Sequence, residues 1–124
     1  MGDLTTNFSA NEFACPCCGE SKMNPDFMQR LQALRNAYGK PFGPVVGGGY
    51  RCVEYNKSFT GAHVEGRAVD PNIPREDYHQ FIKLAFWFKF TGIGVKQKDG
   101  KFQLHIDDAS EIPGVRLRPW VWTY

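Results

Sequence analysis

Three residues have the chemistry of a metal site. His63 opens the stretch HVEGRAVD, which ends at Asp70, and His105 lies further along the chain. Zinc accepts imidazole nitrogen and carboxylate oxygen, and a catalytic zinc site has three protein ligands with the fourth position left for water. Two histidines and one aspartate meet that count, so we identify His63, Asp70 and His105 as candidate zinc ligands.

Composition and spacing alone leave a second interpretation open for these residues. A single histidine is more often a packed or surface residue, and an aspartate after a strand is more often a turn former. The sequence also has no dense signature such as a helical His-Glu-x-x-His. The metal site therefore depends on how the surrounding elements place the three side chains.

The local pattern indicates which side chains share a face. Gly66 permits a tight turn after His63. Side chains alternate between the two faces of a strand, so His105 and Asp107 are expected on one face while Asp108 points the other way. Asp107 should therefore lie next to the last candidate ligand.

Two helices are expected to support these strands. Asn24 followed by Pro25 is typical of an N-cap and a first helical residue, and Gly39 is placed to end the helix, which we predict over residues 25–38. A second helix is predicted over residues 74–90, because acidic residues occupy its first turn and lysines follow later, which matches the helix dipole.

The remaining segments predict a small β-sheet. Residues 92–106 alternate around a polar turn, which is typical of a β-hairpin. Residues 115–124 are predicted as a last strand or an ordered arm, and residues 44–46 as a short buried strand before a glycine turn. The predicted fold class is α+β, with a small antiparallel sheet that carries the candidate ligands and two main helices packed against it.

Length and composition indicate one domain over residues 1–124 with an aromatic core, because 42% of the residues are hydrophobic and 15% aromatic. The net charge is +2 and the basic residues are scattered, so no nucleic-acid partner is expected. The most apolar window, residues 81–90, is too short to cross a bilayer, so no membrane insertion is expected. The N-terminus has no apolar run, so we expect synthesis in the cytoplasm without a signal peptide.

The four cysteines are Cys15, Cys17, Cys18 and Cys52. A cytoplasmic origin favours reduced thiols over disulfides. Thiolates favour zinc, so a second, structural zinc site is one hypothesis. The Cys-x-Cys-Cys run lacks the paired Cys-x-x-Cys knuckles of structural zinc fingers, however, so buried free thiols are the prediction.

Motifs over nearly the whole chain follow a familiar order. A Gly-Gly-Tyr-Arg turn at residues 48–51 precedes the stretch at 63–70, and Gly-Ile-Gly at 92–94 and His-Ile-Asp at 105–107 follow. In this order they resemble the zinc peptidoglycan peptidases of the D-Ala-D-Ala carboxypeptidase and L-alanyl-D-glutamate endopeptidase family, especially small phage endolysins. The resemblance implies a fold like that of hedgehog domains and D-Ala-D-Ala peptidases, with Zn²⁺ on the three candidate ligands.

The sequence departs from the family pattern at three positions. Gly48 and Gly61 stand where the family has serines, so two hydroxyl contacts to substrate are missing. Phe102 stands where many relatives have an acidic residue, three positions before the last histidine. Asp107 is the replacement candidate for that acidic residue.

The resemblance also implies roles for two further residues. Zinc lowers the pKa of a bound water and polarises a carbonyl, and we predict Asp107 as the general base that takes the proton from that water. The alternative is that Asp107 only orients a ligand. Arg51 is predicted to hold the substrate carboxylate or stabilise the oxyanion, and the alternative is that it caps a turn.

The implied activity is hydrolysis of an amide bond in the stem peptide of bacterial peptidoglycan. We expect an endopeptidase that cuts the L-Ala–D-Glu bond, as in a phage endolysin. A D-Ala-D-Ala carboxypeptidase and a non-catalytic zinc-bearing binding domain are the alternatives. The expected partner is the stem peptide, the expected oligomeric state is a monomer, and the expected place of action is the cell wall, in the host periplasm for a phage lysin.

Overall fold

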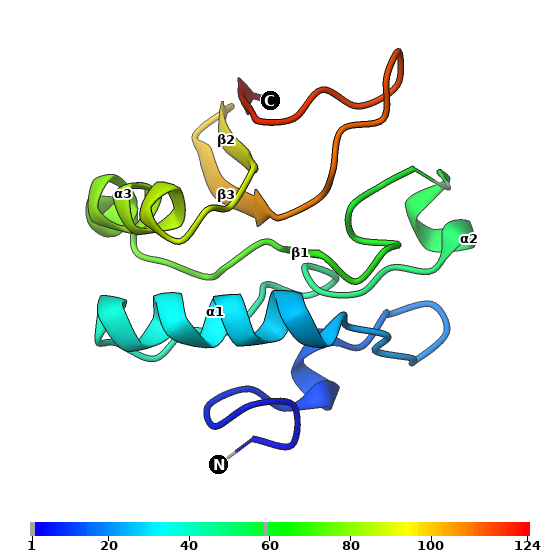
Figure 1. The fold of residues 1–124 in the computed structure, drawn as a ribbon, viewed down its shortest axis with the longest axis horizontal. Helices are drawn as coiled ribbons and strands as arrows, with labels where there is room; N and C mark the ends of the chain where they lie inside the picture. The colour runs from blue at the N-terminus through cyan, green and yellow to red at the C-terminus, as the bar shows by residue number, and fades with distance from the viewer. Residues whose placement is uncertain (1, 59) are drawn as a thin grey trace.

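A four-stranded sheet stands at the centre of the fold (Figure 1). The computed structural model describes residues 2–58 and 60–124 and orders the strands β1-β3-β2-β4. β2 and β3 form the predicted hairpin, and β1 adds antiparallel to β3. The bounds are β1 (Ala68–Val69), β2 (Gly92–Lys98), β3 (Lys101–Asp107) and β4 (Trp120–Thr123).

The sheet differs from the predicted antiparallel arrangement at one edge. β4 pairs with β2 in parallel, with Gly92 opposite Trp120 and Gly94 opposite Trp122. Parallel neighbours need a crossover connection, and the loop over residues 108–119 provides it. The tail is therefore the last strand of a mixed sheet.

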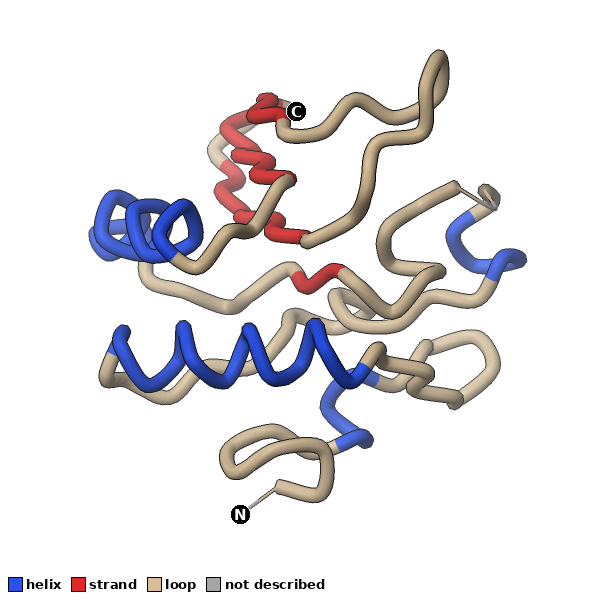
Figure 2. The backbone as a smooth tube through the Cα atoms, viewed as in Figure 1, coloured by secondary structure: helices blue, strands red, loops and turns tan. Residues whose placement is uncertain are grey.

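In Figures 1 and 2, α1 lies below the strands, α3 to their left and α2 to their right. α1 begins as predicted, because the side chain of Asn24 accepts hydrogen bonds from two backbone amides of the first turn, and it ends at Gly39 with φ 77°. α3 ends before the predicted boundary at residue 90, and Lys89 has left the helical region with φ 68°. The bounds are η1 (Ala10–Phe13), α1 (Pro25–Tyr38), α2 (Val53–Asn56), η2 (Arg75–Asp77) and α3 (Tyr78–Trp87).

The main core lies between α1, α3 and the β-hairpin and is rich in aromatic rings, as the composition predicts. Tyr38, Phe42 and Phe81 meet edge to face, with ring centroids 5.3–6.0 Å apart. Such pairs add about 1 kcal/mol each beyond the burial of their area. The α+β fold class is confirmed, and the two main helices pack on the apolar side chains of the β-hairpin.

One local prediction fails, and one helix was not predicted. Residues 44–46 are not a buried strand: Pro44 forms a single bridge with Pro71, and Val46 is 94% exposed. The reason is that the chain turns at once at Gly47, with φ 73°. α2 was not predicted.

Among the described residues, no helix combines the length and the apolar character that crossing a bilayer requires.

Candidate metal centre

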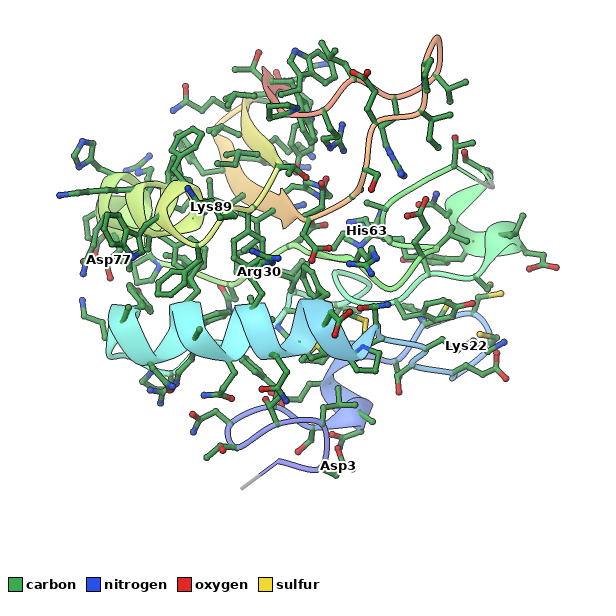
Figure 3. The ribbon with its side chains drawn as sticks, viewed as in Figure 1. Asp3, Lys22, Arg30, His63, Asp77 and Lys89 are labelled. Atoms are coloured by element: carbon green, nitrogen blue, oxygen red, sulfur yellow. The ribbon has the colours of Figure 1, made fainter. Side chains whose placement is uncertain are left out.

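The three predicted zinc ligands meet at one place in the fold. His63 lies in the loop after α2, Asp70 directly follows β1, and His105 lies on β3. The pairing of β1 with β3 brings the last two together: His105 Nδ1 is 3.1 Å from Asp70 Oδ1, and His63 Nε2 is 3.4 Å from the same oxygen. All three residues are buried, and their ligand atoms lie within 4.8 Å of one another. Figure 3 shows His63 in the interior of the molecule.

A backbone carbonyl fixes the orientation of His63. Its Nδ1 lies 2.8 Å from the carbonyl oxygen of Gly49. A carbonyl only accepts hydrogen bonds, so Nδ1 donates, and in the neutral ring Nε2 is left as an acceptor. Burial lowers the pKa of His63 below its usual value, which favours this neutral form. A lone pair on Nε2 therefore faces the carboxylate of Asp70.

The orientation of His105 is also fixed by a hydrogen bond, here through Nε2. Its Nε2 lies 2.6 Å from Asp107 Oδ2, and a carboxylate that is ionised only accepts, so Nε2 donates. In the neutral ring, Nδ1 is then an acceptor that faces Asp70. Burial lowers the pKa of His105, but the hydrogen bonds to Asp107 and Asp70 outweigh burial and raise it. A proton on Nδ1 removes the repulsion between this nitrogen lone pair and the carboxylate of Asp70, and a bound cation would do the same.

When both imidazole rings are neutral, as metal binding requires, three acceptor atoms converge on one point, and a metal ion fits such a set. Two imidazole nitrogens and one carboxylate oxygen are the ligands that zinc takes in catalytic sites. The donor chemistry of these buried residues therefore suits zinc.

The second oxygen of Asp70 is held separately. Arg51 Nη2 donates to Asp70 Oδ2 at 2.8 Å, and Gln103 Nε2 donates to it at 3.2 Å. Burial raises the pKa of Asp70, but its close contacts with His105 and His63 outweigh burial and hold it well below its usual range. Asp70 is ionised, with Oδ1 aimed at the two histidines.

Asp107 lies behind the His105 ring rather than in front of the convergence point. Its carboxylate accepts both Arg118 Nε at 3.0 Å and Arg118 Nη2 at 2.7 Å, and it also accepts the amide of Ala109. The side chain of Asp107 has no exposed area. This geometry does not support the predicted base role, because His105 itself stands between the carboxylate and the place where a water would react.

A pocket of about 180 Å³ opens onto the three ligands. Its other lining residues are Arg51, Gln103, Trp122 and Tyr124. Trp122 packs against the His105 ring with centroids 5.2 Å apart, and Gln103 Nε2 lies 3.2 Å from the hydroxyl of Tyr124. Arg51 also donates to the carbonyl of Gly47, so it caps the glycine turn and faces the pocket at once.

Sequence reasoning missed Gln103, Arg118 and Tyr124. Gln103 had a signal, since it lies two residues before His105 and therefore shares its face. Gly94 was a second signal: a Cβ at Gly94 would lie 2.8 Å from the Trp122 ring, so glycine is needed where β4 approaches β2.

A family comparison agrees with this site. The sequence model of the family described as Peptidase M15 matches residues 6–107, which includes all three candidate ligands. The chain belongs to the peptidase M15 family. No curated protein matches the sequence significantly.

M15 membership confirms the resemblance to zinc peptidases of this group. M15 peptidases depend on zinc, and the converging His63, Asp70 and His105 are residues of this chain that could bind it. The chain is therefore a metallopeptidase of a family whose members act on peptidoglycan peptides.

Proposed function

We propose that this M15 peptidase hydrolyses the L-Ala–D-Glu bond of the peptidoglycan stem peptide, with zinc bound by His63, Asp70 and His105. The single observation that carries the proposal is the convergence of three acceptor atoms beside a pocket that also contains Arg51. Zinc bound here would lower the pKa of a bound water molecule and polarise the carbonyl of the substrate amide. The substrate class follows from the family.

Two contacts orient the ligands in this proposal. The Gly49 carbonyl holds His63 with Nε2 toward Asp70, and Asp107 holds His105 with Nδ1 toward Asp70. Arg118 neutralises Asp107 through two hydrogen bonds. Asp107 is therefore a positioning residue, since the partner of a ligating histidine fixes its tautomer and raises its basicity.

Arg51 is the proposed contact for a substrate carboxylate. The amine side of the L-Ala–D-Glu bond carries a free carboxylate, because the peptide continues through the side-chain carboxyl of D-Glu. The planar guanidinium has five donors, and Asp70 and Gly47 occupy two of them at under 3 Å. The remaining donors can meet that carboxylate in the pocket.

Tyr124 is the proposed donor to the carbonyl oxygen that becomes negative. Burial raises the pKa of Tyr124, so its hydroxyl keeps its proton at neutral pH. Gln103 Nε2 donates to that hydroxyl oxygen, which leaves the hydroxyl proton free to point into the pocket. A protonated phenol aimed at developing charge stabilises the transition state more than the ground state.

The D-Ala-D-Ala carboxypeptidase is the second candidate, since the departing D-Ala also has a carboxylate next to the scissile amide. The similarity to small phage endolysins favours the endopeptidase. We also propose that the protein acts on the cell wall and that it does so as a monomer. A non-catalytic zinc-bearing binding domain is the third candidate, and the digestion below separates it from both peptidases.

Mass spectrometry of purified peptidoglycan after digestion tests the proposal. The expected products are disaccharides that end in L-Ala and peptides that begin with D-Glu, and His63→Ala, which removes one ligand, should yield neither. Release of single D-Ala residues would identify the carboxypeptidase instead. No cleavage by zinc-loaded protein would favour the non-catalytic domain.

A further inference from the structure

A second cluster of metal-binding side chains lies outside the pocket. Cys15 and Cys18 follow η1, and Cys52 precedes α2, yet their sulfur atoms lie within 4.8 Å of one another. The Sγ atoms of Cys15 and Cys52 are 3.7 Å apart, and the amide of Cys52 donates to Cys15 Sγ. None of these thiols belongs to the proposed catalytic site.

The loop that carries the first cysteines has the form of a metal-binding turn. In Cys15-Pro16-Cys17-Cys18-Gly19, the first and fourth residues have Cys-x-x-Cys spacing, with Cys17 between them. The amide of Gly19 donates to the carbonyl of Cys15 at 2.8 Å, and Gly19 closes the turn with φ 77°. A left-handed φ of this kind favours glycine.

The surroundings of Cys15 favour its thiolate. The backbone amide of Cys52 donates to Cys15 Sγ at 3.4 Å. Amides that donate to a sulfur stabilise its charged form. The thiolate is also the form that binds metal.

We propose that Cys15, Cys18 and Cys52 bind a structural zinc ion, with the neighbouring Cys17 completing the four ligands. Thiolates are preferred zinc ligands, and structural zinc sites are closed, four-coordinate sites. Cys17 is the fourth thiol available, since it is exposed and adjoins Cys18 in the same turn. The structure corrects the prediction of buried free thiols in one respect: all four thiols are free, but Cys17 and Cys18 are exposed.

This second zinc would fasten the N-terminal segment to the turn that serves the catalytic site. The amide of Tyr50 donates to the carbonyl of Phe13 at 2.9 Å, and a Cβ at Gly49 would lie 2.6 Å from the Cα of Phe13. Gly49 in turn orients His63 through its carbonyl. Cys15 and Cys52 each lie two residues after a partner in this contact, so one zinc bound by both would hold the two segments together.

Zinc stoichiometry tests the proposal without any measurement of hydrolysis. Native mass spectrometry should give two zinc ions per chain for the unaltered protein. The double variant His63→Ala and His105→Ala should keep one, and Cys18→Ser with Cys52→Ser should keep one. Two zinc ions in the cysteine variant, or none in the histidine variant, would overturn the proposal.

A thiol count on the unaltered protein avoids dependence on any variant that fails to fold. After denaturation in chelator without reductant, four free thiols per chain are expected. In the native protein, zinc should protect them from a thiol reagent, and chelator should expose them. Two free thiols would mean a disulfide, and four that react equally with and without chelator would mean no metal, and either result contradicts the site.

Discussion

The carboxylate of Asp107 lies on the far side of the His105 ring from Asp70. Its Oδ2 is 2.6 Å from Nε2 of His105, while Nδ1 of the same ring is 3.1 Å from Asp70 Oδ1. The imidazole thus bridges two carboxylates, of which Arg118 neutralises the rear one. Asp107 is therefore placed to control how well His105 binds a metal.

Replacing Asp107 by Asn should weaken zinc binding, because the ring of His105 loses its charged partner. Loss of such a partner typically lowers metal affinity roughly 10-fold to 100-fold. Activity should return when zinc is added to saturation. Competition with a chromophoric chelator measures the affinity, and hydrolysis at saturating zinc measures the recovery.

Asp99→Asn is the matched control, because Asp99 lies in the exposed β2–β3 turn with φ 55°, which asparagine tolerates. Its zinc affinity should equal that of the unaltered protein. If Asp107→Asn instead binds zinc normally and stays inactive at saturation, Asp107 is the base after all.

Arg51→Met should lower kcat/KM about 100-fold on a substrate with a carboxylate beside the scissile amide, since the guanidinium contact is lost. Arg51→Lys should recover part of the loss, because lysine restores the charge but not the planar fork. Arg75→Met, outside the pocket, is the control. On a substrate whose carboxylate is replaced by a carboxamide, the Met variant and the unaltered protein should be alike; a persistent difference would show that Arg51 acts only by holding Asp70.

Tyr124→Phe should lower kcat about 100-fold and leave KM nearly unchanged, because the hydroxyl is proposed to act on the transition state. Steady-state kinetics on a defined stem peptide measure both constants. Tyr55→Phe on α2 provides the control, since Tyr55 does not line the pocket. An unchanged kcat in Tyr124→Phe would remove the hydroxyl from the mechanism.

The ends of α1 and α3 are joined by a pH-sensitive contact between Tyr38 and Asp77. Tyr38 Oη donates to Asp77 Oδ2 at 2.6 Å, and Lys40 donates to the same oxygen. Burial and the contact with Asp77 raise the pKa of Tyr38 to about 12, while hydrogen bonds from Tyr38 and Lys40 lower the pKa of Asp77. The contact should therefore weaken at both extremes of pH.

The signs follow from the unfolded values. Unfolded Tyr38 ionises near pH 10, so its contribution to the free energy of unfolding should decline as pH rises from about 10 to 12. The contribution of Asp77 is complete above about pH 4 and declines as pH falls through its lowered folded pKa. Tyr38→Phe should cost about 1.5 kcal/mol at neutral pH and make the alkaline decline smaller. Urea unfolding across pH checks this, and an unchanged alkaline decline would contradict it.

Features encoded locally could be predicted from the sequence. Asn24, Pro25 and Gly39 define both ends of α1 because caps depend only on neighbouring residues. The shared face of His105 and Asp107 follows from strand alternation and is present in the structure. The order of the motifs around His63 and Asp70 was enough to predict the family.

Features that depend on long-range pairing could not be predicted. Arg118 and Tyr124 reach the site only because β4 pairs in parallel with β2, and nothing local specifies that partner. The proximity of Cys15 to Cys52 likewise depends on the contact between Phe13 and Tyr50. For Asp107, the alternation gave the correct face but not the ring nitrogen that it contacts.

The most direct test of the central claim is the release of amino groups from purified peptidoglycan by protein stripped of metal, measured before and after zinc is added. The account predicts no release from the stripped protein, full recovery with zinc, and no recovery in a variant that lacks His63, Asp70 or His105. Amide hydrolysis by the metal-free protein would contradict it.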